Sequence, residues 1–354
     1  MLLKTEVPTP ALLVDLDLLE ANIDRMAQAA KTAGKQLRPH VKAHKCVEIA
    51  RLQVEAGACG VCVATVSEAE MISRAGIGGI LLTSPVADPL KMARIVATGA
   101  MVVVDHVRQV RWYQEAACAA NVQLDVLVDL DVGDHRTGAA SLEQAVNIAL
   151  AIDQAGHLAL RGVQAYSVSG SHGAEAGPTW KIAAEARDAF AAHGLHTDIV
   201  SGGSTGTWNV DLAVPDVTEL QAGSYPLMDL AYRKIGVDFS NAMAVMATVI
   251  SANHADFVTL DAGFKAFSTD RPFGPEVTGV PNAGYRWGGD EFGYVDGSPL
   301  KLGSRVELIP PHCDPTVNLY DRIHACRGRH VEAIWPVMGR MISNTNPAKE
   351  PGPQ

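Results

Sequence analysis

Short apolar runs alternate with helical stretches over the first two-thirds of this chain, and that alternation limits the folds open to it. Continuous apolar runs are typical of parallel strands in a sheet that helices cover. Eight runs of this kind predict a (β/α)8 barrel of the TIM type. An open doubly wound sheet is the alternative, but no G-x-G-x-x-G sequence follows the first run. The eight runs lie at 38–45, 60–64, 79–83, 100–104, 124–129, 160–165, 197–200 and 217–221.

The pattern changes near residue 237, beyond which Gly, Pro, Asn and Asp separate short apolar runs and no long helix is expected. We therefore expect a barrel at 17–236, followed by a mostly antiparallel β domain built from 1–16 and 237–343. A tail at 344–354, which contains three prolines, is expected to be disordered. The strands predicted for the β domain lie at 244–250, 257–260, 305–309 and 331–337, and the predicted helices lie at 17–33, 67–75, 89–97, 108–120, 142–155 and 179–193.

The composition argues against several classes of protein. A net charge of −10 argues against a general nucleic-acid binder. No run of about 18 apolar residues appears, so no membrane-spanning helix is expected, and the first residues lack the layout of a signal peptide. Six cysteines at irregular spacings are interpreted as reduced core thiols. We expect a cytoplasmic protein that binds neither membranes nor nucleic acids.

The octapeptide at 38–45, Arg-Pro-His-Val-Lys-Ala-His-Lys, offers a lysine that could do covalent chemistry. A strand alternates its faces, so His40, Lys42 and His44 would point the same way. Cationic neighbours and partial burial would both lower the pKa of the amine and make it a better nucleophile toward a carbonyl. The functional interpretation is a Schiff-base lysine at position 42. The alternative is a solvated basic loop after a helix.

Other candidate groups follow the predicted strands, where a barrel collects its catalytic residues. Two turns rich in Gly and Ser, at 201–207 and 221–225, suit a phosphate, because glycines let the backbone approach and hydroxyl and N–H groups bind its oxygens. Arg136 follows an acidic loop and suits an anion such as a phenolate oxygen. Tyr166 is either an ordinary core residue or a ring stacked on a flat cofactor, and His172 lies a few residues farther along.

An imidazole and a carboxylate two positions apart, His312 and Asp314, form a third candidate group. In a strand they would share one face, and Pro315 favours an extended conformation at the residue before it. Two such donors with open positions suit a divalent metal such as Mn²⁺, with waters filling the shell, and Cys313 would then be structural. The alternative is a hydrogen-bonded turn.

Together, a Schiff-base lysine on the first barrel strand, a phosphate site at the last strands and a following β domain resemble the alanine-racemase-like, fold-type III pyridoxal-phosphate enzymes. Within that group the chain is similar to the D-threonine aldolase/D-serine dehydratase family, and the matching segments follow the family's order over nearly the whole chain. The segments are 9–17, 38–45, 66–69, 131–133 with Arg136, 164–166 with His172, 202–203, 205–206, 219–225 with Asp229, 261–265 and 312–316.

The resemblance implies a role for each matching residue. Lys42 would form the Schiff base with pyridoxal 5'-phosphate, and His172 or a metal-bound water would act as the base. Gln221 falls where relatives hold the pyridine nitrogen, and a neutral Gln would leave that nitrogen less firmly protonated. His312 and Asp314 match a metal pair, for which Mn²⁺ is expected, with Mg²⁺, Co²⁺ and Zn²⁺ as alternatives. The other cofactor-binding residues would be Arg136 at the phenolic oxygen, Gln164 and Tyr166 near the ring, and Gly203, Ser204, Thr205, Gly223, Ser224 and Tyr225 around the phosphate.

The reaction that the resemblance implies is retro-aldol cleavage of D-3-hydroxy amino acids such as D-threonine, by a homodimeric lyase. Dehydratases of the family tend to have Cys where this chain has Asp314, which favours an aldolase. The alternatives are an aldolase for 3-hydroxyaspartate, a D-serine-type dehydratase that yields a 2-oxo acid and ammonia, an amino-acid racemase and a non-catalytic pyridoxal-phosphate carrier. Phe292 stands where the family usually has His, so we expect a change on the substrate side of the site.

Overall fold

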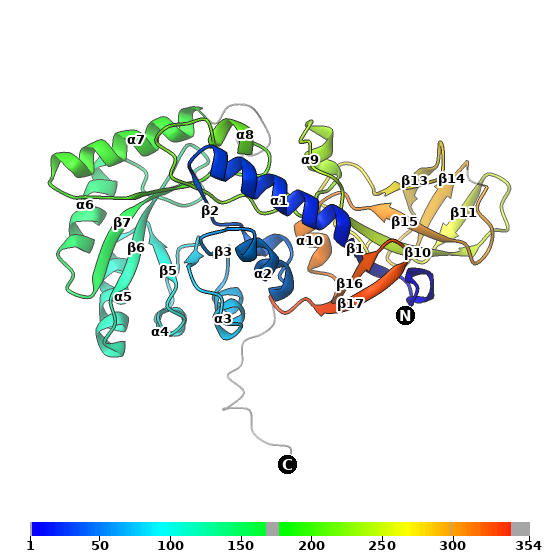
Figure 1. Ribbon diagram of the computed structural model, residues 1–354, viewed down its shortest axis with the longest axis horizontal. Coiled ribbons are helices and arrows are strands. Elements are labelled where there is room, and N and C mark those ends of the chain that lie inside the picture. Colours follow the sequence, from blue (N-terminus) through cyan, green and yellow to red (C-terminus); the bar gives the residue numbers. More distant parts are fainter. Residues whose placement is uncertain (1, 168–176, 298, 341–354) are drawn as a thin grey trace, which may run out of the picture.

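The computed structural model describes residues 2–167, 177–297 and 299–340, which form two sheets that lie side by side (Figure 1). Among these residues, one sheet has eight strands paired in parallel, and the other has nine strands with mostly antiparallel pairs. This agrees with the predicted fold class, so that prediction is confirmed. The predicted base His172 and the predicted tail at 344–354 lie outside the described residues. In the part that is described, no helix is long and apolar enough to cross a membrane.

The parallel sheet follows the order β2-β9-β8-β7-β6-β5-β4-β3 and curls until its two ends meet. The ends meet beyond β2, where the backbone N–H of Cys62 donates to the carbonyl of Pro39 at 2.8 Å. Because the strands run in one direction, their carboxyl ends gather at one edge of the sheet. The strands are β2 (Gln36–Leu37), β3 (Val61–Val63), β4 (Ile80–Leu82), β5 (Met101–Val104), β6 (Leu124–Leu130), β7 (Leu158–Ala165), β8 (Ile199–Gly202) and β9 (Glu219–Leu220).

Helices pack outside this sheet, as Figure 1 shows for α3 to α7. The first helix begins one residue earlier than the sequence predicts, because the side chain of Asp15 accepts from the backbone N–H of Leu18 at 3.1 Å and caps it. It ends before Gly34, which has a left-handed φ of 67°. The helices are α1 (Leu16–Thr32), α2 (Val47–Glu55), α3 (Val66–Arg74), α4 (Pro89–Val96), α5 (Val107–Ala120), α6 (Leu142–Asp153), α7 (Gly177–Ala192) and α8 (Trp208–Asp211).

The lysine segment is not the strand that the sequence predicts. Its pairing with the last strand runs only to His40, whose N–H donates to the carbonyl of Ala222 at 3.2 Å. The next residues, Val41–Ala43, form a turn of 3-10 helix, η2, because the His40 ring accepts from the backbone N–H of Lys42. His40 and Lys42 therefore stay close, while His44 turns away and is buried against Gln53.

The second sheet follows the order β13-β14-β11-β10-β1-β16-β17, with β15 paired to β10 and β12. The N-terminal strand β1 (Ala11–Asp15) pairs with β10 and, in parallel, with β16, so it belongs to this sheet. Two short helices and a 3-10 turn adjoin it: α9 (Leu230–Lys234), α10 (Cys313–Val317) and η1 (Lys4–Glu6). The remaining strands are β10 (Met243–Ser251), β11 (Phe257–Leu260), β12 (Glu276–Val277), β13 (Gly284–Trp287), β14 (Gly293–Asp296), β15 (Arg305–Ile309), β16 (Arg322–Arg327) and β17 (His330–Pro336).

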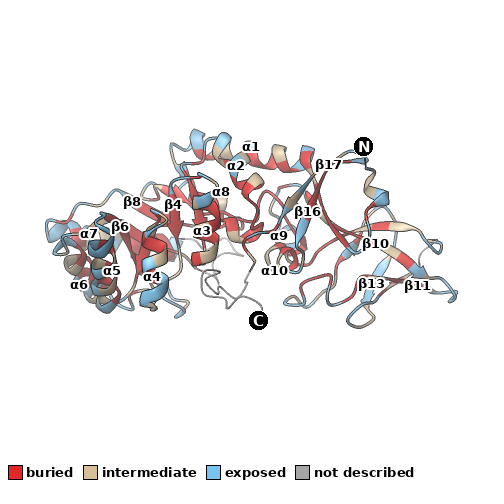
Figure 2. Ribbon diagram, turned by 90° about the horizontal axis from the view of Figure 1, so that it is seen from below, coloured by how far each residue is buried: buried red, intermediate tan, exposed pale blue. Residues whose placement is uncertain are grey.

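One apolar cluster joins the two sheets. It includes Leu19 of α1, Leu220 of β9 and Leu260 of β11, none of which is exposed to solvent. Figure 2 shows this continuity as buried segments that extend from the parallel sheet past α1 into the second sheet. Close-packed interiors deform little, so this cluster fixes the carboxyl edge of the parallel sheet relative to α10.

Candidate active site

A cavity of about 510 Å³ lies at the carboxyl edge of the parallel sheet and is also lined by residues of the second sheet's loops. Tyr225 is a predicted site residue that does not line it, because its side chain is buried and its hydroxyl accepts from Gln53 at 3.0 Å. The cavity thus brings together residues that are far apart in the sequence. The predicted residues that line it are Lys42, Arg136, Gln164, Tyr166, Gly203, Ser204, Thr205, Gln221, Gly223, Ser224, His312 and Asp314.

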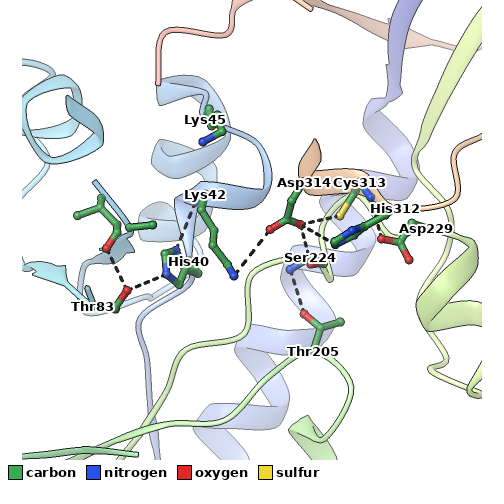
Figure 3. Close-up of polar contacts among 12 residues, drawn as sticks. His40, Lys42, Lys45, Thr83, Thr205, Ser224, Asp229, His312, Cys313 and Asp314 are labelled. Atoms are coloured by element: carbon green, nitrogen blue, oxygen red, sulfur yellow. Dashed lines mark hydrogen bonds and ion pairs between the residues drawn. The ribbon is translucent and has the colours of Figure 1, made fainter. Parts of the chain in front are cut away.

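Lys42 extends across the cavity from η2, and its amine points at α10 (Figure 3). Its Nζ lies 3.9 Å from Oδ1 of Asp314 and 5.9 Å from the ring centre of Tyr166. Lys45 points elsewhere and forms a buried ion pair with Glu68 at 2.7 Å. Of the two lysines in the octapeptide, only Lys42 therefore reaches the cavity.

The pKa of Lys42 is raised, whereas the sequence led us to expect a lowered value. Burial lowers it, as expected, but the nearby carboxylate of Asp314 and the ring of Tyr166 raise it, and they outweigh both burial and Arg136. The sequence reasoning failed because it considered only the cationic neighbours within the octapeptide. The decisive anion, Asp314, comes from a segment far from the octapeptide in the sequence.

His40 lies beside Lys42, and its hydrogen bonds fix its tautomer. Thr83 donates its hydroxyl to the carbonyl of Val63 at 3.1 Å, so it can only accept from Nε2 of His40, at 3.0 Å. Nδ1 of His40 accepts from the backbone N–H of Lys42. Burial and the charge of Lys42 both lower the pKa of His40 well below its usual value, so the ring is neutral.

Two glycine-containing turns face each other beyond β8 and β9. The hydroxyl of Thr205 accepts from the backbone N–H groups of Ser224 and Tyr225, at 3.0 and 3.1 Å, and thereby joins the turns (Figure 3). A Cβ on Gly223 would lie 2.9 Å from the backbone oxygen of His40, and Gly203 has a left-handed φ of 75°. Only glycine suits both positions, so the backbone stays close to the cavity with buried hydroxyls around it.

Arg136 and Tyr166 form the side of the cavity nearest β6 and β7. The guanidinium carbon of Arg136 lies 5.1 Å from the ring centre of Tyr166, within the range of a cation–π contact. Two cations, Arg136 and Lys42, therefore lie close to the ring of Tyr166. A flat anionic ligand placed against this ring would lie near positive charge.

His312 and Asp314 do not lie on a strand. Cys313–Val317 form the short helix α10, with His312 at its N-cap position, and Pro315 falls within the first turn, where proline is tolerated. The two side chains still converge, because Nε2 of His312 lies 3.9 Å from Oδ2 of Asp314. The predicted pair is therefore present, although the predicted strand is wrong.

The side chains around this pair hold it in place. Asp270 accepts from Nδ1 of His312 at 2.7 Å, and Asp229 accepts from the backbone N–H of Cys313 at 2.8 Å. Burial raises the pKa of Asp314, but Lys42, His312 and the thiol of Cys313 together lower it to about 2. Asp314 is therefore a carboxylate at neutral pH. Residues 2–167, 177–297 and 299–340 contain no group of three or more His, Cys, Asp or Glu side chains arranged to hold a metal.

Sequence reasoning missed several residues of this site. Thr83 and Tyr232 line the cavity, and Thr83 ends a predicted strand, so the rule that identified Lys42 could also have identified it. Asp270 and Arg271 come from an irregular segment before β12, where no periodic pattern marked them. Phe292 is not among the residues that line the cavity and is 45% exposed.

Comparison with protein families gives two matches that together span most of the chain. "Alanine racemase, N-terminal domain" matches residues 14–229, and "Putative serine dehydratase domain" matches residues 242–326. The first match ends, and the second begins, between the parallel sheet and the main strands of the second sheet.

Similar proteins match over nearly the full length. A 3-hydroxy-D-aspartate aldolase of Paracoccus denitrificans (strain Pd 1222) is 36% identical, over 95% of this chain and 93% of its own. A D-threonine aldolase of Arthrobacter sp is 37% identical, over 95% of this chain and 94% of its own. The crystal structure of D-threonine aldolase from Filomicrobium marinum covers 96% of this chain and 98% of its own, with a TM-score of 0.92 and 34% identity.

Proposed function

This chain belongs to the alanine racemase N-terminal domain family and is a lyase of the aldolase type, and on that premise we propose that it acts as a D-threonine-type aldolase. It would cleave D-3-hydroxy amino acids to glycine and an aldehyde, with pyridoxal phosphate and a divalent cation. The observation that carries this proposal is the position of Lys42, which faces His312 and Asp314 within one cavity. An amine that condenses with a carbonyl and a pair suited to a cation are what such a cleavage requires.

The residues of the cavity fit pyridoxal phosphate. Gly203 and Gly223 bring the backbone close, and the hydroxyls of Ser204, Thr205 and Ser224 suit the phosphate. Arg136 would hold the phenolic oxygen, and Tyr166 would lie against or near the ring. Gln164 and Gln221 are buried and also line the cavity.

The residues on the opposite wall fit a cation of the Mn²⁺ type. Metal–ligand bonds of about 2.0–2.2 Å allow two ligand atoms up to roughly 4 Å apart to share one ion, and His312 Nε2 and Asp314 Oδ2 are 3.9 Å apart. Asp270 accepts from the other ring nitrogen, which is how histidine ligands are usually oriented. Two protein ligands leave the other positions to water or substrate, which suits Mn²⁺ or Mg²⁺.

When bound, the cofactor supplies an electron sink for the bond that breaks, and the cation lowers the pKa of the substrate hydroxyl. The chain's own residues hold these groups and move protons. Lys42 would provide the amine that holds the cofactor, and its free Nζ would hold a proton near Asp314. His172 remains the predicted acceptor of the hydroxyl proton, with a metal-bound water as the alternative.

Product analysis tests this proposal. Protein loaded with pyridoxal phosphate is incubated with D-threonine or D-serine, in the presence of Mn²⁺ or of EDTA. Glycine and acetaldehyde from D-threonine, lost with EDTA and restored by Mn²⁺, are expected. A 2-oxo acid with ammonia would indicate a dehydratase instead, and bound cofactor without any product would indicate a carrier. We also propose a homodimer, which analytical ultracentrifugation of the same sample would test.

A second candidate substrate is D-3-hydroxyaspartate, and Arg271 favours it. Arg271 lines the cavity on the wall that carries His312 and Asp314. Asp270 lies 3.7 Å from its Nε and offsets part of its charge. Hydroxyaspartate carries a second carboxylate on the carbon that bears the hydroxyl, and the arginine fork suits such a group.

The ratio of activities on the two substrates tests this role of Arg271. For Arg271→Leu, kcat/KM for D-3-hydroxyaspartate should fall by about 10- to 100-fold more than that for D-threonine, since one charge-assisted hydrogen-bonding group is lost. Arg233→Leu is the matched control, because Arg233 pairs with Glu276 and does not line the cavity. Equal losses for both substrates would instead assign Arg271 to the shared α-carboxylate or to the structure of the wall.

A further inference from the structure

Two groups of buried side chains in the wall of the cavity are linked by hydrogen bonds and meet at Gln221. On one side, Nε2 of Gln164 donates to the carbonyl of Thr83 at 2.9 Å and to Asp129 at 2.8 Å. On the other side, the hydroxyl of Ser201 donates to Oε1 of Glu219 at 2.7 Å. Gln221 lies between these groups at the end of β9 and is 5% exposed.

The first side of this chain fixes the direction of the Gln221 amide. Amide nitrogen and oxygen must be assigned from their partners, and a backbone carbonyl can only accept. The carbonyl of Thr83 therefore requires the amide nitrogen of Gln164 on its side. The oxygen of Gln164 is then the atom that faces Gln221, so Gln221 must donate to it, at 3.2 Å.

The second side fixes the same direction independently. Nη2 of Arg38 donates to Oε2 of Glu219 at 2.7 Å, and both side chains are nearly inaccessible. A carboxylate paired in this way accepts, so Ser201 gives it the only proton on its hydroxyl. The oxygen of Ser201 must then accept from Nε2 of Gln221, at 2.9 Å. Both N–H groups of Gln221 are thus used within the wall, and its Oε1 is the atom left to the cavity.

We propose that Gln221 presents its carbonyl oxygen to the cavity, and that this oxygen accepts a hydrogen bond from a protonated ring nitrogen of the bound cofactor. The inference rests on the proposed function, because it assumes that pyridoxal phosphate occupies the cavity. An oxygen acceptor stabilises the protonated ring, whereas an amide turned the other way would stabilise the unprotonated ring. The direction of the amide reverses the expectation that a neutral Gln leaves the nitrogen less firmly protonated. Gln164, Ser201 and Glu219 act as positioning residues, since they reach the cofactor only through Gln221.

The test measures the ring nitrogen itself. The full-length protein is loaded with pyridoxal phosphate that carries the heavy nitrogen isotope in its ring, and the chemical shift of that nitrogen is followed against pH by NMR. Near neutral pH the native protein should show the protonated ring. Gln221→Leu should move the transition to lower pH by about one to two units, as expected for one hydrogen bond to a charged donor. Gln221→Glu should move it to higher pH.

Two further variants distinguish an effect of the orientation of the Gln221 amide from a general disturbance of the fold. Ser201→Ala removes one constraint on the amide, so the transition should move in the same direction as for Gln221→Leu, but less. Gln53→Leu is the matched control, because Gln53 is another buried amide, bonded to His44 and Tyr225 outside the cavity. It should leave the transition unchanged.

The outcomes separate this inference from the proposed function. A ring that is unprotonated near neutral pH in a protein that cleaves D-threonine would overturn the inference and leave the aldolase intact. A transition that Gln221→Leu and Ser201→Ala both leave in place would also overturn it. A protonated ring that responds to these variants in a protein without aldolase activity would support the inference and contradict the proposed function.

Discussion

The two walls of the cavity are built in different ways. The wall at the edge of the parallel sheet consists of strand ends and glycine turns whose polar groups largely bond to one another, such as Thr205 with Ser224. The wall on the second sheet carries His312 and Asp314 at the start of the short helix α10, and Asp270 from an irregular segment supports His312. The first wall suits a permanent ligand of fixed shape, and the second suits an ion and a variable substrate.

This difference between the walls suggests which side chains can change between related enzymes without loss of the fold. Changing a strand-end turn disturbs a hydrogen-bonded backbone, whereas changing Arg271 or Asp314 alters the charge of one side chain without disturbing a strand. We therefore expect the first wall to determine whether the cofactor binds and the second to determine what is cleaved. The predictions that follow separate the walls by the step that each variant affects.

The largest effect is expected at Lys42, where the walls meet. Lys42→Ala removes the amine proposed to condense with the cofactor, so turnover of D-threonine should fall by roughly 10³-fold or more. Borohydride reduction followed by peptide mass analysis should find the cofactor on the peptide that contains Lys42 in the native protein and not in the variant. Cofactor attached to Lys45 would contradict the assignment, since Lys45 is buried against Glu68.

The second-largest effect should be confined to the wall that carries His312 and Asp314, the proposed metal ligands. Asp314→Asn keeps the size of the side chain but removes the charge that would hold the cation, so activity should fall by roughly 10²-fold or more. The absorbance of bound pyridoxal phosphate should persist, because the residues of the strand-end wall remain and Asn can still accept from the hydroxyl of Ser224, which donates to Asp314 at 3.2 Å. Loss of the cofactor together with the activity would show that the two walls are not separable in this way.

A smaller effect is expected at Asp270, which accepts from Nδ1 of the proposed metal ligand His312 at 2.7 Å. Asp270→Asn should raise the concentration of Mn²⁺ needed for half-maximal activity by about 10- to 100-fold, with activity recovering at saturating Mn²⁺. Asp290→Asn is the matched control, because Asp290 lies at the surface near Lys265. If saturating Mn²⁺ did not restore activity, Asp270 would have a role beyond metal binding.

The sequence predicts the strand-end wall well because topology dictates it. Once eight apolar runs form one parallel sheet, the residues after them must meet at one edge, and Arg136, Tyr166, Thr205 and Gln221 all do. The helical turn at Lys42 was not predicted, since it depends on a single bond from its N–H to the His40 ring. A cap formed by one side chain does not alter the spacing of apolar residues, so the sequence pattern does not reveal it.

The opposite wall could be predicted only in part. The sequence predicts His312 and Asp314 because they lie only two positions apart and are chemically suited to a metal, even though the predicted strand is wrong. Asp270 and Arg271 gave no such signal, because their relation to His312 depends on how an irregular segment packs. The raised pKa of Lys42 depends on the same packing, since Asp314 is the anion that opposes the effect of burial.

The smallest effect is expected at Asp129, which supports the strand-end wall, and it should change the stability of the fold rather than its activity. Burial raises the pKa of Asp129 to about 6, against the opposing hydrogen bonds from Gln164 and Thr137. The folded state therefore favours the protonated form of Asp129 more than the unfolded state does. Protonated Asp129 contributes fully to the stability of the fold below about pH 4, and this contribution is lost as pH rises through about 6. Asp129→Asn stays neutral, so its thermal midpoint relative to the native protein should rise between these pH values, by the equivalent of roughly 1–3 kcal/mol.

The control for this prediction lies on the same strand. Asp125 pairs with Arg161 at the surface, at 2.9 Å, and exposed ion pairs contribute little to stability, so Asp125→Asn should change the midpoint only slightly throughout. A constant offset for Asp129→Asn from pH 4 to pH 7, about the range of its shifted pKa, would mean that this carboxyl does not titrate beneath the cavity. Asp129 would then remain a charged acceptor for Gln164, and the strand-end wall would be less apolar at its base than its burial implies.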